Sequence, residues 1–256
     1  MGNVAMWSLS IVVINQLVGI LTTRVTNGAP IQGNDLYGIA GNASYQNAFT
    51  LYMLPYALVA VSIATAIFPR LSLYVTENRI DDVRDTLSYS LRRCGIIMLF
   101  ITAMFVAIPV PIIKALLPSV PLSEINLIAP LLIALGINSW AASAFLFLQR
   151  TFYAFENGKY PFIFTVIQNA VQIIGIMIAQ FSFAPRYWTL GVAISVTVSY
   201  AVSLPVLFYL SQKKLFNGTL NIARIVLSFG KTVIAAVITA LLSYSLYAIL
   251  IRIMHI

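Results

Sequence analysis

Long apolar segments follow one another along almost the whole chain, and they restrict the possible folds more than any other feature. The hydrocarbon core of a bilayer is about 30 Å thick, which a helix of about 20 residues can cross. Backbone polar groups in lipid must be paired within the segment itself, so such segments are expected to be helical. Seven transmembrane α-helices are therefore predicted: Val4–Thr23, Ala48–Phe68, Cys94–Leu117, Ile125–Leu148, Phe162–Phe183, Trp188–Leu210 and Phe229–Ile251.

Composition supports an all-α integral membrane protein and excludes several functions. Of the 256 residues, 60% are hydrophobic and 9% are charged, which is far from the average of soluble domains. Cys94 is the only cysteine and His255 the only histidine, so no disulfide, metal site or cofactor is expected. No acid–base pair or nucleophile can be assembled either, and the chain is not expected to be an enzyme.

Basic residues divide unequally between alternate loops. Cytoplasmic loops of membrane proteins carry an excess of Lys and Arg, which predicts a cytoplasmic N-terminus here. The predicted external side holds only Arg24, Lys114, Arg186 and Arg252. The predicted cytoplasmic side holds Arg70, Arg79, Arg84, Arg92, Arg93, Arg150, Lys159, Lys213, Lys214, Arg224 and Lys231.

The loop after the second apolar segment contains a narrow apolar stripe with helical spacing. It consists of Ile80, Val83, Leu87 and Leu91, with acidic residues before it and arginines after it, as a helix dipole favours. This pattern predicts an amphipathic helix on the inner membrane surface.

Polar residues inside the predicted spans are uncharged and grouped. No Asp or Glu falls within any of the seven segments, so the chain lacks the carboxylates on which ion-coupled transport usually relies. Thr165, Gln168, Asn169 and Gln172 share one helical face. They either hydrogen-bond neighbouring helices or line a water-filled cavity.

Two other helices carry similar polar faces. Asn15 shares a face with Gly19, Thr22 and Thr23, and Arg24 ends that span. The guanidinium of Arg24 either snorkels to the interface or attracts an anionic head group. Ser195, Ser199 and Ser203 recur every fourth residue, and hydrogen bonding to neighbouring helices is the preferred interpretation for them.

Proline and small residues mark the second segment, "LYMLPYALVAVSIATAIFPRLS". Pro55 and Pro69 lie near its two ends, and alanines and a serine lie between them. Such a helix can bend and can pack closely against its neighbours. Bent, closely packed helices suit a transporter that alternates between two states, although channels and receptors also use them.

Three stretches together resemble the MurJ/MviN family of lipid II flippases. The stretch just quoted is similar to the family's eighth membrane helix, and "LQRTFYAFENGKYP" is similar to a cytoplasmic turn of the family. The start "INQLVGILTTRV" looks like its seventh helix. The matches cover the first five predicted helices at the family's spacing.

The resemblance implies a fold of two six-helix lobes that face a central cavity. Residues 1–212 would form the second lobe, and residues 213–256 a cytoplasmic link and one additional transmembrane helix. The implied activity is the transfer of undecaprenyl-pyrophosphate-linked peptidoglycan precursor, lipid II, to the outer leaflet of the bacterial plasma membrane. The missing first lobe would come from a longer chain, which is the favoured explanation, or from another subunit.

Candidate site residues combine the polar faces with the resemblance. The expected substrate cavity comprises Asn15, Arg24, Thr50, Gln168, Asn169 and Gln172, and the expected cytoplasmic turn comprises Arg150, Glu156 and Lys159. Thr50 stands where many family members carry a basic residue. The cationic contact to pyrophosphate must then come from Arg24 or from the missing lobe, unless it is not needed in the same way.

Two other functions fit the sequence. One is a related polysaccharide-lipid or multidrug exporter, although drug exporters usually need an acidic residue in the cavity. The other is a membrane scaffold that does not transport and binds cell-wall synthesis proteins through its loops. Lipids and a lipid-linked precursor are the expected partners, and the dominance of membrane spans argues against nucleic acid.

Overall fold

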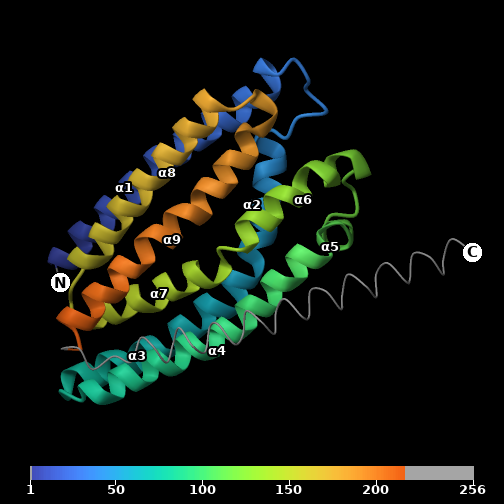
Figure 1. Cartoon of the computed structure of the whole chain (residues 1–256). Helices are drawn as coiled ribbons and strands as arrows, with labels where there is room; N and C mark the ends of the chain where they lie inside the picture. The colour runs from blue at the N-terminus through green and yellow to red at the C-terminus, as the bar shows by residue number, and fades with distance from the viewer. Residues whose placement is uncertain (1, 217–256) are drawn as a thin grey trace, which may run out of the picture.

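The computed structural model describes residues 2–216 as a bundle of helices, with no strand in that range (Figure 1). The elements in chain order are α1 (Gly2–Gln32), α2 (Asn42–Pro55), the π-helix η1 (Tyr56–Val61), α3 (Ser62–Thr76), α4 (Ile80–Ala107), α5 (Pro109–Leu116), α6 (Leu122–Gly136), α7 (Ser139–Ala154), α8 (Lys159–Ser182), the short 3₁₀ turn η2 (Pro185–Tyr187) and α9 (Trp188–Lys214).

The described helices account for five or six membrane crossings. Five spans are long and apolar enough to cross a bilayer, and α6 with α7 forms a sixth if the bent pair is counted as one span. The all-α fold with multiple membrane crossings, expected from the sequence, is confirmed. The seventh predicted segment, Phe229–Ile251, lies outside the described residues.

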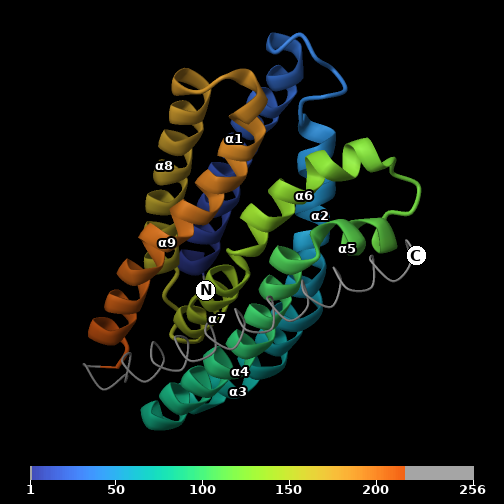
Figure 2. The ribbon, with the colours of Figure 1, turned by 45° about the vertical axis from the view of Figure 1, so that its right-hand side comes forward.

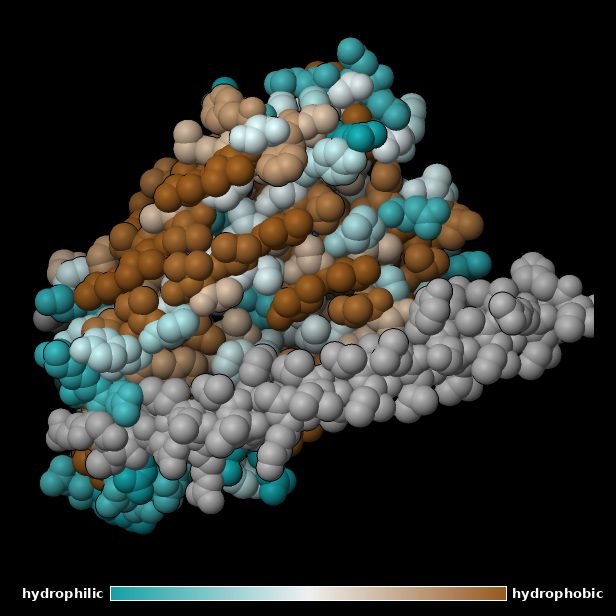
Figure 3. Space-filling view, viewed as in Figure 1, coloured by the Kyte–Doolittle hydropathy of each residue, from teal (hydrophilic) through white to brown (hydrophobic). Residues whose placement is uncertain are grey.

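The connections alternate between the two ends of the bundle. Figure 1 shows the N-terminus, the α3–α4 and α7–α8 turns and the end of α9 at one end, at the lower left. The loops α1–α2, α5–α6 and α8–α9 lie at the other end, and the turned view in Figure 2 agrees. In the space-filling view, apolar side chains cover the middle of the molecule and hydrophilic ones gather at its ends (Figure 3), as a bilayer requires.

The second predicted span is one crossing with a change of helical register. Pro55 ends α2, and the π-helix η1 follows it directly. Proline has no N–H to donate, and its ring crowds the carbonyl of the residue four positions earlier, here Leu51. A π-bulge is one of the few ways in which a helix continues past such a defect.

A second interruption lies between α6 and α7, which meet at an angle of 43°. Ile125–Leu148 is therefore two helices and not the single one that was predicted. The carbonyl oxygen of Gly136 at the break accepts hydrogen bonds from the hydroxyls of Thr102, at 2.9 Å, and Ser139, at 2.7 Å. Side chains thus satisfy the backbone where the helical ladder stops.

The helix α4 corrects two sequence-based expectations. It is continuous from Ile80 to Ala107, and the break in Cys94–Leu117 falls at Ile108, whose φ and ψ are −136° and 53°. Val83, Leu87 and Leu91 are 0%, 0% and 2% exposed. They belong to a buried cluster that includes residues of α3 and α7. The prediction of a separate amphipathic helix on the membrane surface is wrong, because the apolar stripe packs against protein.

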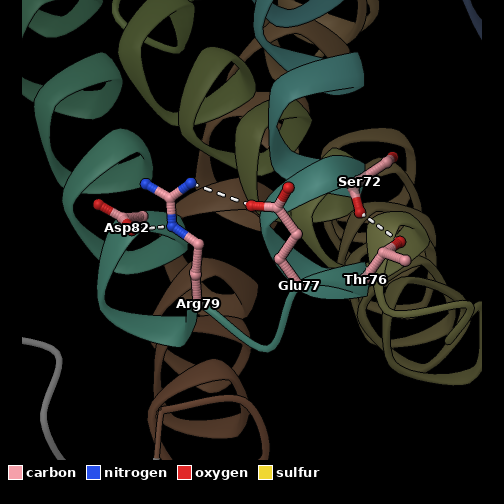
Figure 4. A network of polar contacts seen from close by, with 5 residues as sticks. All are labelled: Ser72, Thr76, Glu77, Arg79 and Asp82. Carbon is pink, nitrogen blue, oxygen red and sulfur yellow. Dashed lines mark hydrogen bonds and ion pairs between the residues drawn. The ribbon is translucent and has the colours of Figure 1, made fainter.

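The turn between α3 and α4 is exposed and held by ion pairs (Figure 4). The guanidinium of Arg79 contacts Glu77 at 3.0 Å and Asp82 at 2.7 Å. Hydrogen bonds that its guanidinium donates to the carboxylates of Glu77 and then Asp82 raise the pKa of Arg79 above its ordinary value. Pairs this exposed contribute little to stability, so they fix the path of the turn more than they stabilise the bundle.

Burial of the stripe on α4 gives the first prediction. Leu87→Ala should lower the free energy of unfolding by about 3 kcal/mol, because it leaves a cavity in a packed interior. Ile96→Ala on the same helix is the matched control, since Ile96 is 51% exposed and lipid or detergent replaces the methyl groups that are lost. Unfolding titrations with a denaturing detergent measure both changes. Equal small effects would contradict the packing of α4 described above.

Candidate functional site

A polar cavity of about 860 Å³ lies between α1, α2, α7, α8 and α9. It extends along α1 from Ile11 to Asn27, which is about 24 Å at the rise of an α-helix. Its polar lining from α1 consists of Asn15, Gln16, Thr22, Thr23, Arg24 and Asn27. The other polar lining residues are Tyr45, Gln46, Gln149, Thr165, Gln168, Asn169, Gln172 and Tyr200.

A direct side-chain contact joins α8 to α1 at the cavity wall. The Nδ2 group of Asn169 donates to Oδ1 of Asn15 at 2.8 Å and to the carbonyl of Thr165 at 2.9 Å. Asn169 is buried and Asn15 is exposed. The pair therefore fixes the distance between the two helices and leaves part of the Asn15 amide facing the cavity.

A second contact joins α8 to α9. The Nε2 group of Gln168 donates to Oε1 of Gln172 and to Oγ of Ser199, each at 3.0 Å. Gln168 and Gln172 are 7% and 8% exposed. The two interpretations of this polar face therefore coexist, because the same side chains hydrogen-bond neighbouring helices and line the cavity.

Electrostatics of the cavity are set by one cation. Among the described residues that line it, Arg24 is the only charged one, and it is exposed. It takes part in none of the ion pairs of the described chain. A guanidinium without a carboxylate partner attracts anions, and its planar fork suits phosphate oxygens.

The structure does not bring every predicted site residue to the cavity. Thr50 is exposed and is not part of the lining. Arg150 follows the lining residue Gln149 on α7, with its guanidinium 5.7 Å from the ring of Phe68. Glu156 and Lys159 belong to the α7–α8 turn, where Glu156 has a φ of 52°. Binding roles for all of these residues stay predictions.

The serine stripe on α9 departs from its preferred interpretation. The hydroxyls of Ser195, Ser199 and Ser203 donate to the carbonyls of Val192, Val196 and Ser199 on α9 itself. Within residues 2–216, only Ser199 among the three makes a side-chain hydrogen bond to another helix, as the acceptor from Gln168. Among the described residues, Ser195 and Ser203 therefore bond their own helix and not a neighbouring one, contrary to the expectation.

Several lining residues were missed because α1 and α2 are longer than predicted. The α1 helix runs to Gln32 and α2 starts at Asn42, so Asn27 and Gln46 lie within helices and not in loops. Asn27 follows Arg24 by three residues, a spacing that places both on one face. That spacing is the signal that could have identified Asn27.

Taken together, fold and site define a multi-pass α-helical membrane protein with a polar, cation-bearing cavity between its helices. The sequence profile described as "Lipid II flippase MurJ" matches residues 2–255. The chain belongs to this family, and the resemblance seen in the sequence is confirmed.

Comparison with solved structures supports the fold. A chain described as "Lipid II flippase MurJ, inward closed conformation" matches with a TM-score of 0.65 and 18% identity. The match covers 93% of this chain and 52% of that one, so this chain spans about half of its length. No curated protein sequence matches.

Water access to the cavity can be tested with single cysteines. Gln16→Cys should react with a membrane-impermeant maleimide at least about tenfold faster than Ile174→Cys, because thiolate forms only where water reaches the sulfur. Gln16 lines the cavity, whereas Ile174 is an exposed apolar residue of α8 outside it. The native Cys94 is 1% exposed and gives little background. Equal rates would mean that water does not fill the cavity.

Proposed function

We propose that this chain is the second lobe of a transporter that moves lipid II from the inner to the outer leaflet of the bacterial plasma membrane. The observation that carries this proposal is the polar cavity with Arg24 as the only charged residue among the described ones that line it. Membership of the MurJ family supports the substrate class. Movement of an intact lipid between leaflets breaks no covalent bond, so the proposed activity needs no catalytic residue.

The lining matches the chemistry of such a substrate. A pyrophosphate needs a cation, which Arg24 supplies, and sugar and peptide groups need donors and acceptors, which the amides of Asn15, Gln16 and Gln172 supply. A related drug or cation exporter is a poorer fit, because no carboxylate of residues 2–216 lines this cavity. The scaffold function makes no use of a polar cavity at membrane depth.

The other half of the transporter follows from the comparison of lengths. Since this chain spans about half of the matched flippase, we propose that a first lobe faces the polar cavity and completes it. That lobe belongs either to the same full-length protein or to another subunit. Exposure of Asn15, Gln16 and Arg24 is consistent with a surface that faces such a partner.

Orientation of the bundle has its own test. The charge distribution favours a cytoplasmic N-terminus, which makes the α3–α4 turn cytoplasmic and the α1–α2 loop external. In intact cells, Tyr37→Cys should react with a membrane-impermeant maleimide, and Asn78→Cys should react only after lysis. Tyr37 is 91% exposed and Asn78 is also exposed. The reverse pattern would invert the assigned topology.

Transport itself is tested by depletion of the full-length protein and measurement of lipid II at the outer leaflet with an external probe. We expect the unchanged protein to restore the signal and Arg24→Gln to restore about a tenth of it or less, since a hydrogen bond to a charged group is lost. The double variant Gln168→Leu with Gln172→Leu should fail in the same way. Lys114→Gln, which removes a charge outside the cavity, is the control and should restore it fully.

A scaffold would give the opposite result. Arg24→Gln and the double glutamine variant would then support growth and leave outer-leaflet lipid II unchanged, whereas Arg150→Glu, in the last turns of α7, would abolish function. The amount of each variant in the membrane must be measured and must be equal, because the experiment compares activity per molecule of protein.

A further inference from the structure

A second hollow, of about 430 Å³, lies between α8 and α9, and the proposed transport does not use it. It extends from Val171 and Val198, in the interiors of the two helices, to Phe183 and Tyr187 at the turn that joins them. Its lining is almost entirely apolar. We call it the α8–α9 groove.

Two glycines explain why the groove has a floor of backbone. A Cβ at Gly175 would overlap Ser195, and a Cβ at Gly191 would overlap Ala179. The two helices therefore approach closely along this line. The walls are formed by larger side chains that stay exposed, such as Ile178 at 52% and Ile194 at 47%.

The dimensions of the groove match one leaflet. From Val171 to Ala179 it follows α8 for eight residues, about 12 Å at the rise of an α-helix, and it then continues to the turn. Half of the hydrocarbon core of a bilayer is about 15 Å thick. The groove therefore covers the depth of the acyl chains on the side of the α8–α9 turn.

A cation lies at the mouth of the groove. Arg186 is exposed, and its guanidinium stands 4.6 Å from the ring centroid of Tyr187, which lines the groove. Arg186 takes part in none of the ion pairs of the described chain. The acidic residue of the adjacent α1–α2 loop, Asp35, accepts hydrogen bonds from the backbone N–H groups of Tyr37 and Gly38 instead.

An apolar groove at acyl-chain depth with an unpaired guanidinium at its interfacial end fits one class of ligand. We propose that the α8–α9 groove binds an anionic phospholipid, with an acyl chain in the groove and the phosphate on Arg186. Both halves of the ligand are recognised, because the groove lets the acyl chain pack closely against backbone and apolar side chains and a guanidinium hydrogen-bonds phosphate oxygens bidentately.

Lipid retention measured by native mass spectrometry tests the site. The full chain, purified in detergent, is mixed with phosphatidylglycerol or with phosphatidylcholine of the same acyl chains. We expect preferential retention of phosphatidylglycerol and a loss of about tenfold in its affinity on Arg186→Gln, because a charge-assisted hydrogen bond is removed. Lys114→Gln, which removes a charge from α5 at the same end of the bundle, should leave retention unchanged.

The acyl part of the site has its own matched pair. Ile178→Trp should fill the groove and reduce retention, whereas Ile174→Trp, on the same helix but outside the groove, should not. Equal retention of the two lipids by the unchanged chain would overturn the proposal. Equal effects of Arg186→Gln and Lys114→Gln would also overturn it, as would equal effects of Ile178→Trp and Ile174→Trp. A disulfide-linked dimer of Ile178→Cys in native membranes would also overturn it, because a second copy would then occupy the groove.

Discussion

Lipid offers no partner to a backbone amide or carbonyl, and this constraint governs how the bundle can bend. Two of the interruptions show how the backbone stays hydrogen-bonded. At the α6–α7 break, Thr102 and Ser139 donate to the carbonyl of Gly136, and after Pro55 the ladder changes to π-helical register. The helix α7, which follows the bend, then lines the polar cavity together with α1, α2, α8 and α9. The position of the cavity therefore depends on where the backbone could be satisfied.

Apolar length alone located the described crossings, because the thickness of a bilayer leaves few alternatives. It could not locate the bends or the partner of the stripe on α4. An apolar stripe shows that a helix has an apolar neighbour, but lipid and protein are equally acceptable to Leu87. The stretch from Ile80 to Cys94 contains no Gly or Pro, and this was the available sign that the stripe and the following span form one helix.

Side-chain spacing predicted that four polar residues share one face of α8. In the structure all four, Thr165, Gln168, Asn169 and Gln172, line the cavity. Spacing could not predict the partners of these residues on α1 and α9, which depend on how three helices are placed side by side. The polar run around Arg24 resembled the end of a span, yet α1 continues. The hydroxyl of Thr26 donates to the carbonyl of Thr22 and contacts Oδ1 of Asn42. Because this hydroxyl is hydrogen-bonded, Thr26 can lie within the helix.

The continuity of α4 has a mechanical consequence. A single helix of 28 residues is about 42 Å long, and it begins at the exposed α3–α4 turn and ends beside the break before α5. Near its C-terminal third, Thr102 holds the carbonyl at the α6–α7 bend. A tilt imposed on the turn at one surface would be transmitted along a stiff rod to that bend. The exposed α3–α4 turn is therefore mechanically connected, through α4, to the bend from which α7 leads to the cavity.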